Sequence, residues 1–183
     1  MTHKGTVTLE TERLVLRRFV KTDIEDVFNN WGSDPEAAKY LWSPPHKDIA
    51  VTREYNKERL RNYKRDNYYN WAIELKATGQ VIGNISAFNL REGIQSVEVG
   101  SVMGKAWWNQ GYMTEALCRL VKFLFEEVGA NRIESNHDPR NPGSGRVLQK
   151  AGMTYEGTLR QAGSNNRGVC DQACYAILAN EYG

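Results

Sequence analysis

Residues 95–128, QSVEVGSVMGKAWWNQGYMTEALCRLVKFLFEEV, join a short strand to the most regularly patterned helix of the chain. Over 95–103, apolar residues alternate with polar or small ones, which is typical of a strand. Apolar residues then recur at spacings of three and four, which predicts a buried helix. These residues are Met113, Ala116, Leu117, Leu120, Val121, Leu124 and Val128. Gly111 precedes this helix and Gly129 follows it as a C-cap, so a tight turn separates strand from helix.

Strands and helices are also expected on both sides of this unit. The expected strands are 14–19, 67–76, 80–90, 131–137, 153–160 and 169–178, and the expected helices are 22–31, 51–65 and 141–152. Thr22, three residues before Glu25, indicates a capping box for the first helix. Consecutive strands before the long helix imply antiparallel hairpins, and the later strand–helix–strand portion permits parallel pairing. We therefore expect a single mixed α/β domain over residues 1–183, with a mostly antiparallel sheet of about seven strands and helices on both faces.

The composition fits a globular protein and gives no argument for a nucleic-acid or membrane partner. The chain has 24 Lys and Arg against 22 Asp and Glu, a net charge of +2, and 40% hydrophobic residues. No apolar stretch has the length of a membrane helix, and the first residues, MTHKGTVTLETERL, lack the apolar core of a signal peptide. Three cysteines, an odd and sparse number, suit a reducing cytoplasm.

Two of the cysteines, Cys170 and Cys174, lie close enough in sequence to be considered as metal ligands. They fall in an alternating segment that predicts a strand, where residues four apart lie about 13 Å from each other. That separation is too long for one zinc ion. We therefore expect no metal site.

The start of the long helix has the features of an anion site. The first amides of a helix have no internal partner, and the helix dipole adds partial positive charge there. A preceding glycine such as Gly111 allows a phosphate to approach the backbone closely. The amides would come from Asn109, Gln110, Gly111, Tyr112, Met113 and Thr114. Taken alone, the same glycine would also serve as a simple turn into a core helix.

Two longer stretches make the binding interpretation specific. EVGSVMGKAWWNQGYMTEAL (98–117), followed by NPGSGRVLQKAGMTYEGTLR (141–160), resembles the GNAT superfamily of acetyl-CoA-dependent N-acetyltransferases, and within it the Rim-type branch that includes ribosomal-protein N-terminal acetyltransferases. The superfamily signature Q/R-x-x-G-x-G/A falls on 108–113, with Trp108 and Met113 departing from it. A second signature is met by Asn141, Ser144, Lys150 and Gly152.

This resemblance implies a GNAT-like fold and acetyl-CoA as cosubstrate. The CoA pyrophosphate would bind the amides of residues 109–114, and Trp108 would bind the cofactor as well. The pantetheine arm would pair with the strand end at Val102 and Met103, one of which would also supply the oxyanion donor. Asn141 would bond to the cofactor as well.

Acetyl transfer to an amine needs a base, stabilisation of the carbonyl oxygen and an acid for the thiolate. Glu98 interrupts an apolar strand, and burial there would make its carboxylate a better base. The resemblance also points to a glutamate on this strand, and it points to Ser144 as the acid. His137 is the alternative base, or a group that binds substrate.

The acceptor is less well defined by the sequence. Tyr40, Leu41, Trp42 and His46 lie in a proline-stiffened segment that shapes the acceptor pocket in the resembled family, but such aromatic residues can also pack as a hydrophobic latch. The helix near 51–66 carries six basic residues, which would either contact an acidic partner such as ribosomal RNA or form a solvated face.

We therefore expect an N-acetyltransferase acting on a protein or peptide N-terminus, such as that of a ribosomal protein. A small-molecule acceptor (a polyamine, amino acid or aminoglycoside) and a CoA-binding module without turnover remain as alternatives. The resemblance also allows a homodimer, which no residue pattern in the chain tests.

Overall fold

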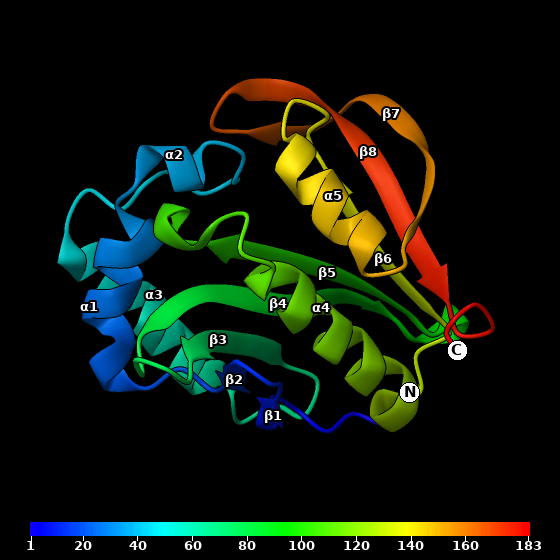
Figure 1. Ribbon diagram of the computed structural model, residues 1–183, viewed down its shortest axis with the longest axis horizontal. Helices are drawn as coiled ribbons and strands as arrows, with labels where there is room; N and C mark the ends of the chain where they lie inside the picture. The colour runs from blue at the N-terminus through cyan, green and yellow to red at the C-terminus, as the bar shows by residue number, and fades with distance from the viewer.

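An eight-stranded sheet runs through the computed structural model, which describes residues 1–183 (Figure 1). The strand order is β1-β2-β3-β4-β5-β6-β8-β7, and only β5 and β6 are parallel neighbours. The strands are β1 (Leu9–Glu10), β2 (Leu14–Arg17), β3 (Tyr69–Leu75), β4 (Val81–Arg91), β5 (Ser96–Met103), β6 (Arg132–His137), β7 (Thr154–Asn165) and β8 (Gly168–Leu178). The predicted mixed, mostly antiparallel sheet is confirmed. The strand beyond the expected seven is β1, whose two residues are too few to leave a pattern.

Helices cover both faces of this sheet, as expected. They are α1 (Ile24–Val27), α2 (Pro35–Ala38), α3 (Ile49–Asn62), α4 (Tyr112–Phe123) and α5 (Pro142–Lys150). The helices α1 and α3 pack on one face, and α4 and α5 on the other (Figure 1). No helix is both long and apolar enough to cross a membrane.

The first helical segment begins differently from the prediction. It starts as a 3₁₀ turn at Lys21, with Val20 as its N-cap. The Asp23 carboxylate accepts a hydrogen bond from the Val20 amide at 2.7 Å. The expected capping box of Thr22 and Glu25 is therefore wrong, because the chain turns into the helix before Thr22 and the aspartate supplies the cap.

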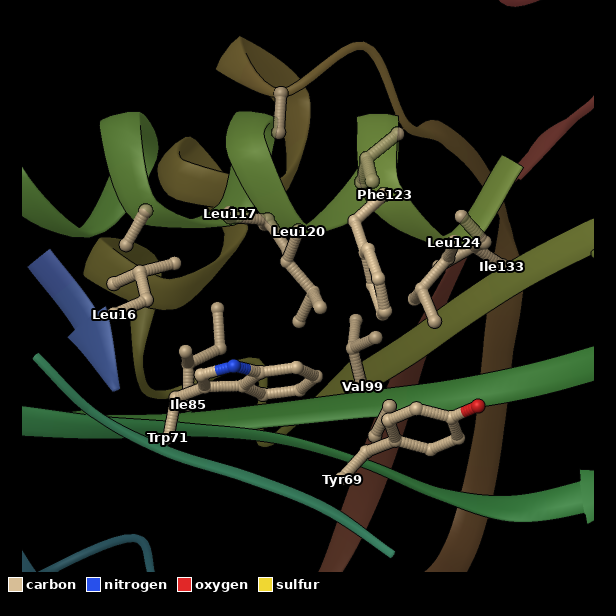
Figure 2. Packing of buried hydrophobic residues seen from close by; sticks show 14 of the residues in the cluster. Leu16, Tyr69, Trp71, Ile85, Val99, Leu117, Leu120, Phe123, Leu124 and Ile133 are labelled. Atoms are coloured by element: carbon tan, nitrogen blue, oxygen red, sulfur yellow. The ribbon is translucent and has the colours of Figure 1, made fainter. Parts of the chain in front are cut away.

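The core lies between α4 and the sheet (Figure 2). Leu117, Leu120 and Phe123 point from α4 toward Trp71 of β3, whose side chain is fully buried. The Phe123 ring meets the Trp71 ring edge to face, with centroids 5.8 Å apart. Burying each such side chain stabilises the fold by roughly 1.5–3 kcal/mol. The apolar stripe predicted for this helix is thus its contact with the sheet.

Alternation along β5 decides which side chains face which helices. Val97, Val99 and Met103 belong to the core under α4. Val102 packs instead with the cluster on the α1–α3 face. Because successive strand residues point to opposite faces, Glu98 shares the α1–α3 face with Val102. The helix α4 and the predicted base Glu98 therefore lie on opposite sides of one strand.

Candidate active site

The sheet opens between its two parallel strands. Pairing of β5 with β6 is limited to Ser96–Glu98 against Arg132–Glu134. Beyond this point β5 remains paired with β4, and β6 remains paired with β8 (Figure 1). The last link is a side chain, because Ser135 Oγ donates to the Val99 carbonyl at 2.8 Å. A wedge-shaped split follows, with one free backbone edge on β5.

The backbone groups that face this split belong to alternate residues of β5. The carbonyls of Val99 and Met103 point away from β4, since they accept from Ser135 and from the Trp108 indole nitrogen, the latter at 2.7 Å. By the alternation of an antiparallel ladder, the amide and carbonyl of Ser101 face the split as well. The Val102 carbonyl points toward Gly83 on β4. Of the two residues predicted to pair with pantetheine, Met103 has its backbone directed into the split and Val102 does not.

The loop before α4 presents a row of free amides at the open end of the split. Gly111 is the N-cap of α4 in the left-handed conformation, with φ of +83°, and Asn109 is also left-handed, with φ of +59°. No backbone or side-chain group accepts from the amides of residues 109–114; the first bond of the helix runs from the Glu115 amide to the Gly111 carbonyl. Six consecutive free donors at a helix start are an arrangement that can bind an anion.

The start of α5 lies on the same face as α4. Asn141 is its N-cap, and the Asn141 side-chain oxygen accepts from the Ser144 amide at 3.4 Å. Pro142 occupies the first position, as the sequence indicates. The Ser144 side chain is half-buried, and its hydroxyl makes no hydrogen bond to the protein. That hydroxyl is therefore free to donate to a ligand.

Glu98 lies where β5 and β6 separate, and two amide side chains hold it. Asn136 on β6 donates to one carboxylate oxygen at 2.8 Å, and Asn89 donates to the other at 2.7 Å. Each oxygen keeps a second lone pair for a substrate proton. Phe88, directly opposite Glu98 on β4, is 40% exposed and gives this side an apolar wall. No local sequence pattern indicates that these two asparagines meet Glu98.

His137 lies on the other face of the sheet from Glu98. Its ring stacks on Tyr175 at 5.5 Å, and its Nδ1 donates to the Asp138 carbonyl at 2.8 Å. The remaining nitrogen, Nε2, is buried against Gly145 of α5 and has no partner. The structure therefore does not bring His137 together with Glu98.

The predicted acceptor residues Tyr40 and Trp42 belong to a segment that reaches the tip of the β7–β8 hairpin. Tyr40 donates through its hydroxyl to the Arg140 carbonyl at 2.7 Å. Asn166 donates its backbone amide to Leu41 O at 3.0 Å, and its side chain to the carbonyls of residues 38 and 43 at 2.8 Å. We call the segments 38–43, 138–141 and 165–167 the arch. Trp42 is 89% exposed, so it does not act as a hydrophobic latch.

His46, also considered for the acceptor pocket, precedes α3 and packs against it. Its Nδ1 bonds with the Thr52 hydroxyl at 2.7 Å, and its ring stacks on Tyr55. Burial, and secondarily the charge of Arg59, lower the pKa of His46. Arg59 itself is half-buried with its guanidinium over the Phe19 ring, so it is not part of a solvated basic face.

Asp138 holds the arch together from inside. Its buried carboxylate accepts from the Arg140 guanidinium at 2.6 Å and from the Asn165 side chain at 2.8 Å. The hydrogen bond from Arg140 is the largest influence and holds the pKa of Asp138 far below its usual range, although burial acts in the opposite direction. The carboxylate is thus charged throughout the neutral and mildly acidic pH range.

Replacing Asp138 with asparagine is expected to lower the midpoint of thermal unfolding by about 4–8 °C at pH 7. Lost charge-assisted hydrogen bonds cost about 2 kcal/mol, and in a chain of this length each kcal/mol shifts the midpoint by about 2–4 °C. Because the folded-state pKa is depressed, this stabilisation is complete above the unfolded pKa near 4 and declines as pH falls below it. Unfolding curves at pH 7, 4 and 2.5 measure this decline. An equal difference between wild type and variant at pH 7 and 2.5 would contradict it.

Comparison with known families gives this geometry a context. The family described as "Acetyltransferase (GNAT) domain" matches residues 13–154. A Bacillus licheniformis protein named "Uncharacterized N-acetyltransferase p20" is 29% identical over 176 residues, which cover 96% of this chain and 98% of the relative. The Escherichia coli ribosomal protein uS5-alanine N-acetyltransferase is 24% identical, covering 82% of this chain and 80% of that protein.

Solved structures share the fold. A GNAT-family acetyltransferase from Bacillus anthracis superposes with a TM-score of 0.83 at 28% identity, covering 95% of this chain and 99% of the other. The microcin C7 self-immunity acetyltransferase MccE, solved with acetyl-CoA and AMP, superposes with a TM-score of 0.82 at 17% identity, covering 92% and 93%.

Proposed function

The chain belongs to the GNAT acetyltransferase family, and from this premise we propose that it transfers the acetyl group of acetyl-CoA to the α-amine of a protein or peptide. The observation that carries the proposal is the combination of the split after Glu98 with six free amides beside its open end. One feature offers an extended edge for an amide-containing arm, and the other offers donors for a pyrophosphate.

The residues present fit CoA in both charge and shape. The amides of residues 109–114 would bind the pyrophosphate, and the indole of Trp108 is fixed to Met103 at the loop edge. Ser101 and Met103 would pair with the amides of the pantetheine arm, a refinement of the predicted Val102 and Met103. The side-chain NH2 group of Asn141 and the hydroxyl of Ser144 make no hydrogen bond within the protein, and they would line the arm from α5. Acetyl-CoA supplies the acyl group as a thioester, activated for attack by an amine.

In this arrangement the two substrates reach the split from opposite faces. Glu98 would accept a proton from the acceptor ammonium on the α1–α3 face. The amine nitrogen would form the new bond to the acetyl carbon as the carbon–sulfur bond breaks. A backbone amide of β5 that faces the split, such as that of Met103, would stabilise the carbonyl oxygen. On the α4–α5 face the Ser144 hydroxyl would protonate the departing thiolate. The second proton that the nitrogen loses as the amide forms would restore the serine hydroxyl.

Two considerations support an α-amine as the acceptor. An α-amine has a pKa near 8, against about 10.4 for a lysine side chain, so it gives up its proton much more easily near neutral pH. A carboxylate held by neutral amides, as Glu98 is, is sufficient for that transfer. The E. coli relative is named for acetylation of the alanine of a ribosomal protein. MccE was solved with AMP, which keeps a small-molecule acceptor as the competing outcome.

The test is an acceptor screen with purified protein and acetyl-CoA, following release of free thiol. Peptides of about eight residues with free and with blocked N-termini are compared with spermidine, free amino acids and an aminoglycoside. Turnover with free-N-terminus peptides alone supports the proposal. Turnover only with the small amines would overturn the peptide assignment, and binding of acetyl-CoA without turnover of any acceptor would favour a non-catalytic module.

Changing Ser144 to alanine is expected to lower kcat by about 10- to 100-fold with little effect on binding of CoA. General acid catalysis typically contributes 10²- to 10⁴-fold, and because a thiolate is a good leaving group, the effect here should lie at or below the lower end of that range. The Asn141 side chain caps the helix through the backbone amide of Ser144, which alanine keeps, so the fold should be retained. Steady-state kinetics measure the change, and an unaltered kcat would remove Ser144 from the acid role.

A further inference from the structure

Arg13, at the end of the turn between β1 and β2, contacts the anion loop from the side. Its Nη1 donates to the Gln110 carbonyl at 3.1 Å. Its guanidinium carbon lies 4.3 Å from the centre of the Tyr112 ring. Its Nη2 is the nearest group to the place where a side chain on Gly111 would begin, at 3.4 Å. One side chain therefore touches three consecutive residues of the loop.

Glu115 fixes the position of this arginine. Its carboxylate accepts from Arg13 Nε at 2.7 Å, from the Arg13 amide at 2.9 Å and from the Thr11 hydroxyl at 2.6 Å. Although burial alone would raise the pKa of Glu115, these three donors together lower it below the ordinary value. A carboxylate in the first turns of α4 would repel a bound phosphate, and here the Arg13 guanidinium compensates its charge.

The bond to Gln110 determines which way the next amide points. In a trans peptide the carbonyl and the following N–H point in opposite directions. Because Arg13 holds the Gln110 carbonyl on its own side, the Gly111 amide is directed away from Arg13, among the free donors of the loop. Without Arg13, rotation of this peptide would turn a carbonyl dipole toward the bound anion.

We propose that Arg13 is a positioning residue for cosubstrate binding: held by Glu115, which Thr11 in turn binds, it sets the Gln110–Gly111 peptide so that the loop presents only donors to the CoA pyrophosphate. This inference rests on the proposed function. It assigns to a residue about 100 positions away in sequence the selection of phosphate-containing acyl donors over shorter thioesters.

The test compares wild type, Arg13→Gln and Arg13→Lys by calorimetric titration with CoA. Arg13→Gln is expected to raise the Kd for CoA about 10- to 100-fold, which is the usual effect of losing a hydrogen bond to a charged group. Arg13→Lys keeps a positive charge near Glu115 but loses the guanidinium group that donates to the Gln110 carbonyl. A smaller rise in the Kd, of about 3- to 10-fold, is therefore expected. Arg53→Gln, which removes an exposed arginine on α3, is the matched control and should leave the Kd unchanged.

Kinetics separate positioning from general damage to the fold. For Arg13→Gln the KM for acetyl-CoA should rise while kcat stays within about twofold. The kcat/KM for acetyl-pantetheine, which has no pyrophosphate, should not change. Equal losses with both donors, or an unchanged Kd for CoA, would overturn the inference. If Arg13→Gln does not fold, the same measurements on Arg13→Lys decide. Failure of wild type to bind CoA would instead refute the proposed function itself.

Discussion

Gly111→Glu is expected to weaken binding of CoA by at least about 100-fold. The new carboxylate would stand at the first turn of α4, beside the free amides of residues 109–114. Two unit charges about 6 Å apart repel by about 3 kcal/mol at an effective dielectric constant of about 20. The new group would also compete with Glu115 for Arg13, because the side chain at position 111 starts 3.4 Å from Arg13 Nη2. Calorimetric titration with CoA measures the loss.

Gly111→Asn is the matched control for this prediction. Gly111 has a φ of +83°, a conformation that asparagine adopts more readily than most residues. The only atom within 4 Å of a new Cβ at this position is Arg13 Nη2, at 3.4 Å, so neither variant meets backbone. Asparagine should therefore raise the Kd by less than about 10-fold. Equal binding by glycine, asparagine and glutamate variants would show that the helix start is only a turn.

The elements that carry this loop could be predicted because their signals are local. The strand, the glycine and the apolar stripe of α4 follow one another within about 30 residues, and each pattern reports its own backbone state. The same holds for Asn141 and Pro142 at the start of α5. Local capping was less predictable at the first helix, where Asp23 competes with Thr22 for the same role.

Contacts between distant segments left no such signal. Arg13 meets Glu115 across 102 residues, and Asn136 meets Glu98 across 38, without any periodicity that links them. Register was the second obstacle, because a shift by one residue moves a strand side chain to the opposite face. The alternation along each strand places the His137 side chain on the opposite face of the sheet from Glu98. It also points the Val102 carbonyl toward β4.

The same alternation would allow β5 to contact both proposed substrates, one with its backbone and one with its side chains. Odd-numbered residues of β5 point their backbone groups into the split, and even-numbered side chains face α1–α3. A cofactor bound along the backbone edge therefore leaves Glu98 accessible from the other face. The proposed base and the proposed acid, Ser144, can then act on one reacting centre without contacting each other.

Glu98→Gln is expected to lower kcat by about 100-fold or more at pH 7, with the Kd for CoA unchanged within about twofold. Loss of a general base typically costs 10²- to 10⁴-fold. Binding of CoA should be spared because Glu98 lies on the face away from α4 and α5. Glutamine keeps the shape of the side chain but has only one acceptor oxygen. Asn89 and Asn136 donate to two different oxygens of Glu98, so one of them would lose its acceptor. Thermal unfolding of the variant shows whether this mismatch disturbs the fold.

The pH dependence distinguishes a base from a structural group at this position. A peptide α-amine has a pKa near 8, so at pH 9 most of the acceptor is already neutral and needs no base. The ratio of wild-type to Glu98→Gln activity should therefore fall steadily from pH 6.5 to pH 9. Asn136→Ala is the companion variant, since it removes a donor and keeps the carboxylate. It should retain most activity at every pH. A ratio that stays constant across the pH range would mean that Glu98 orients the acceptor or holds β5 against β6 without removing a proton.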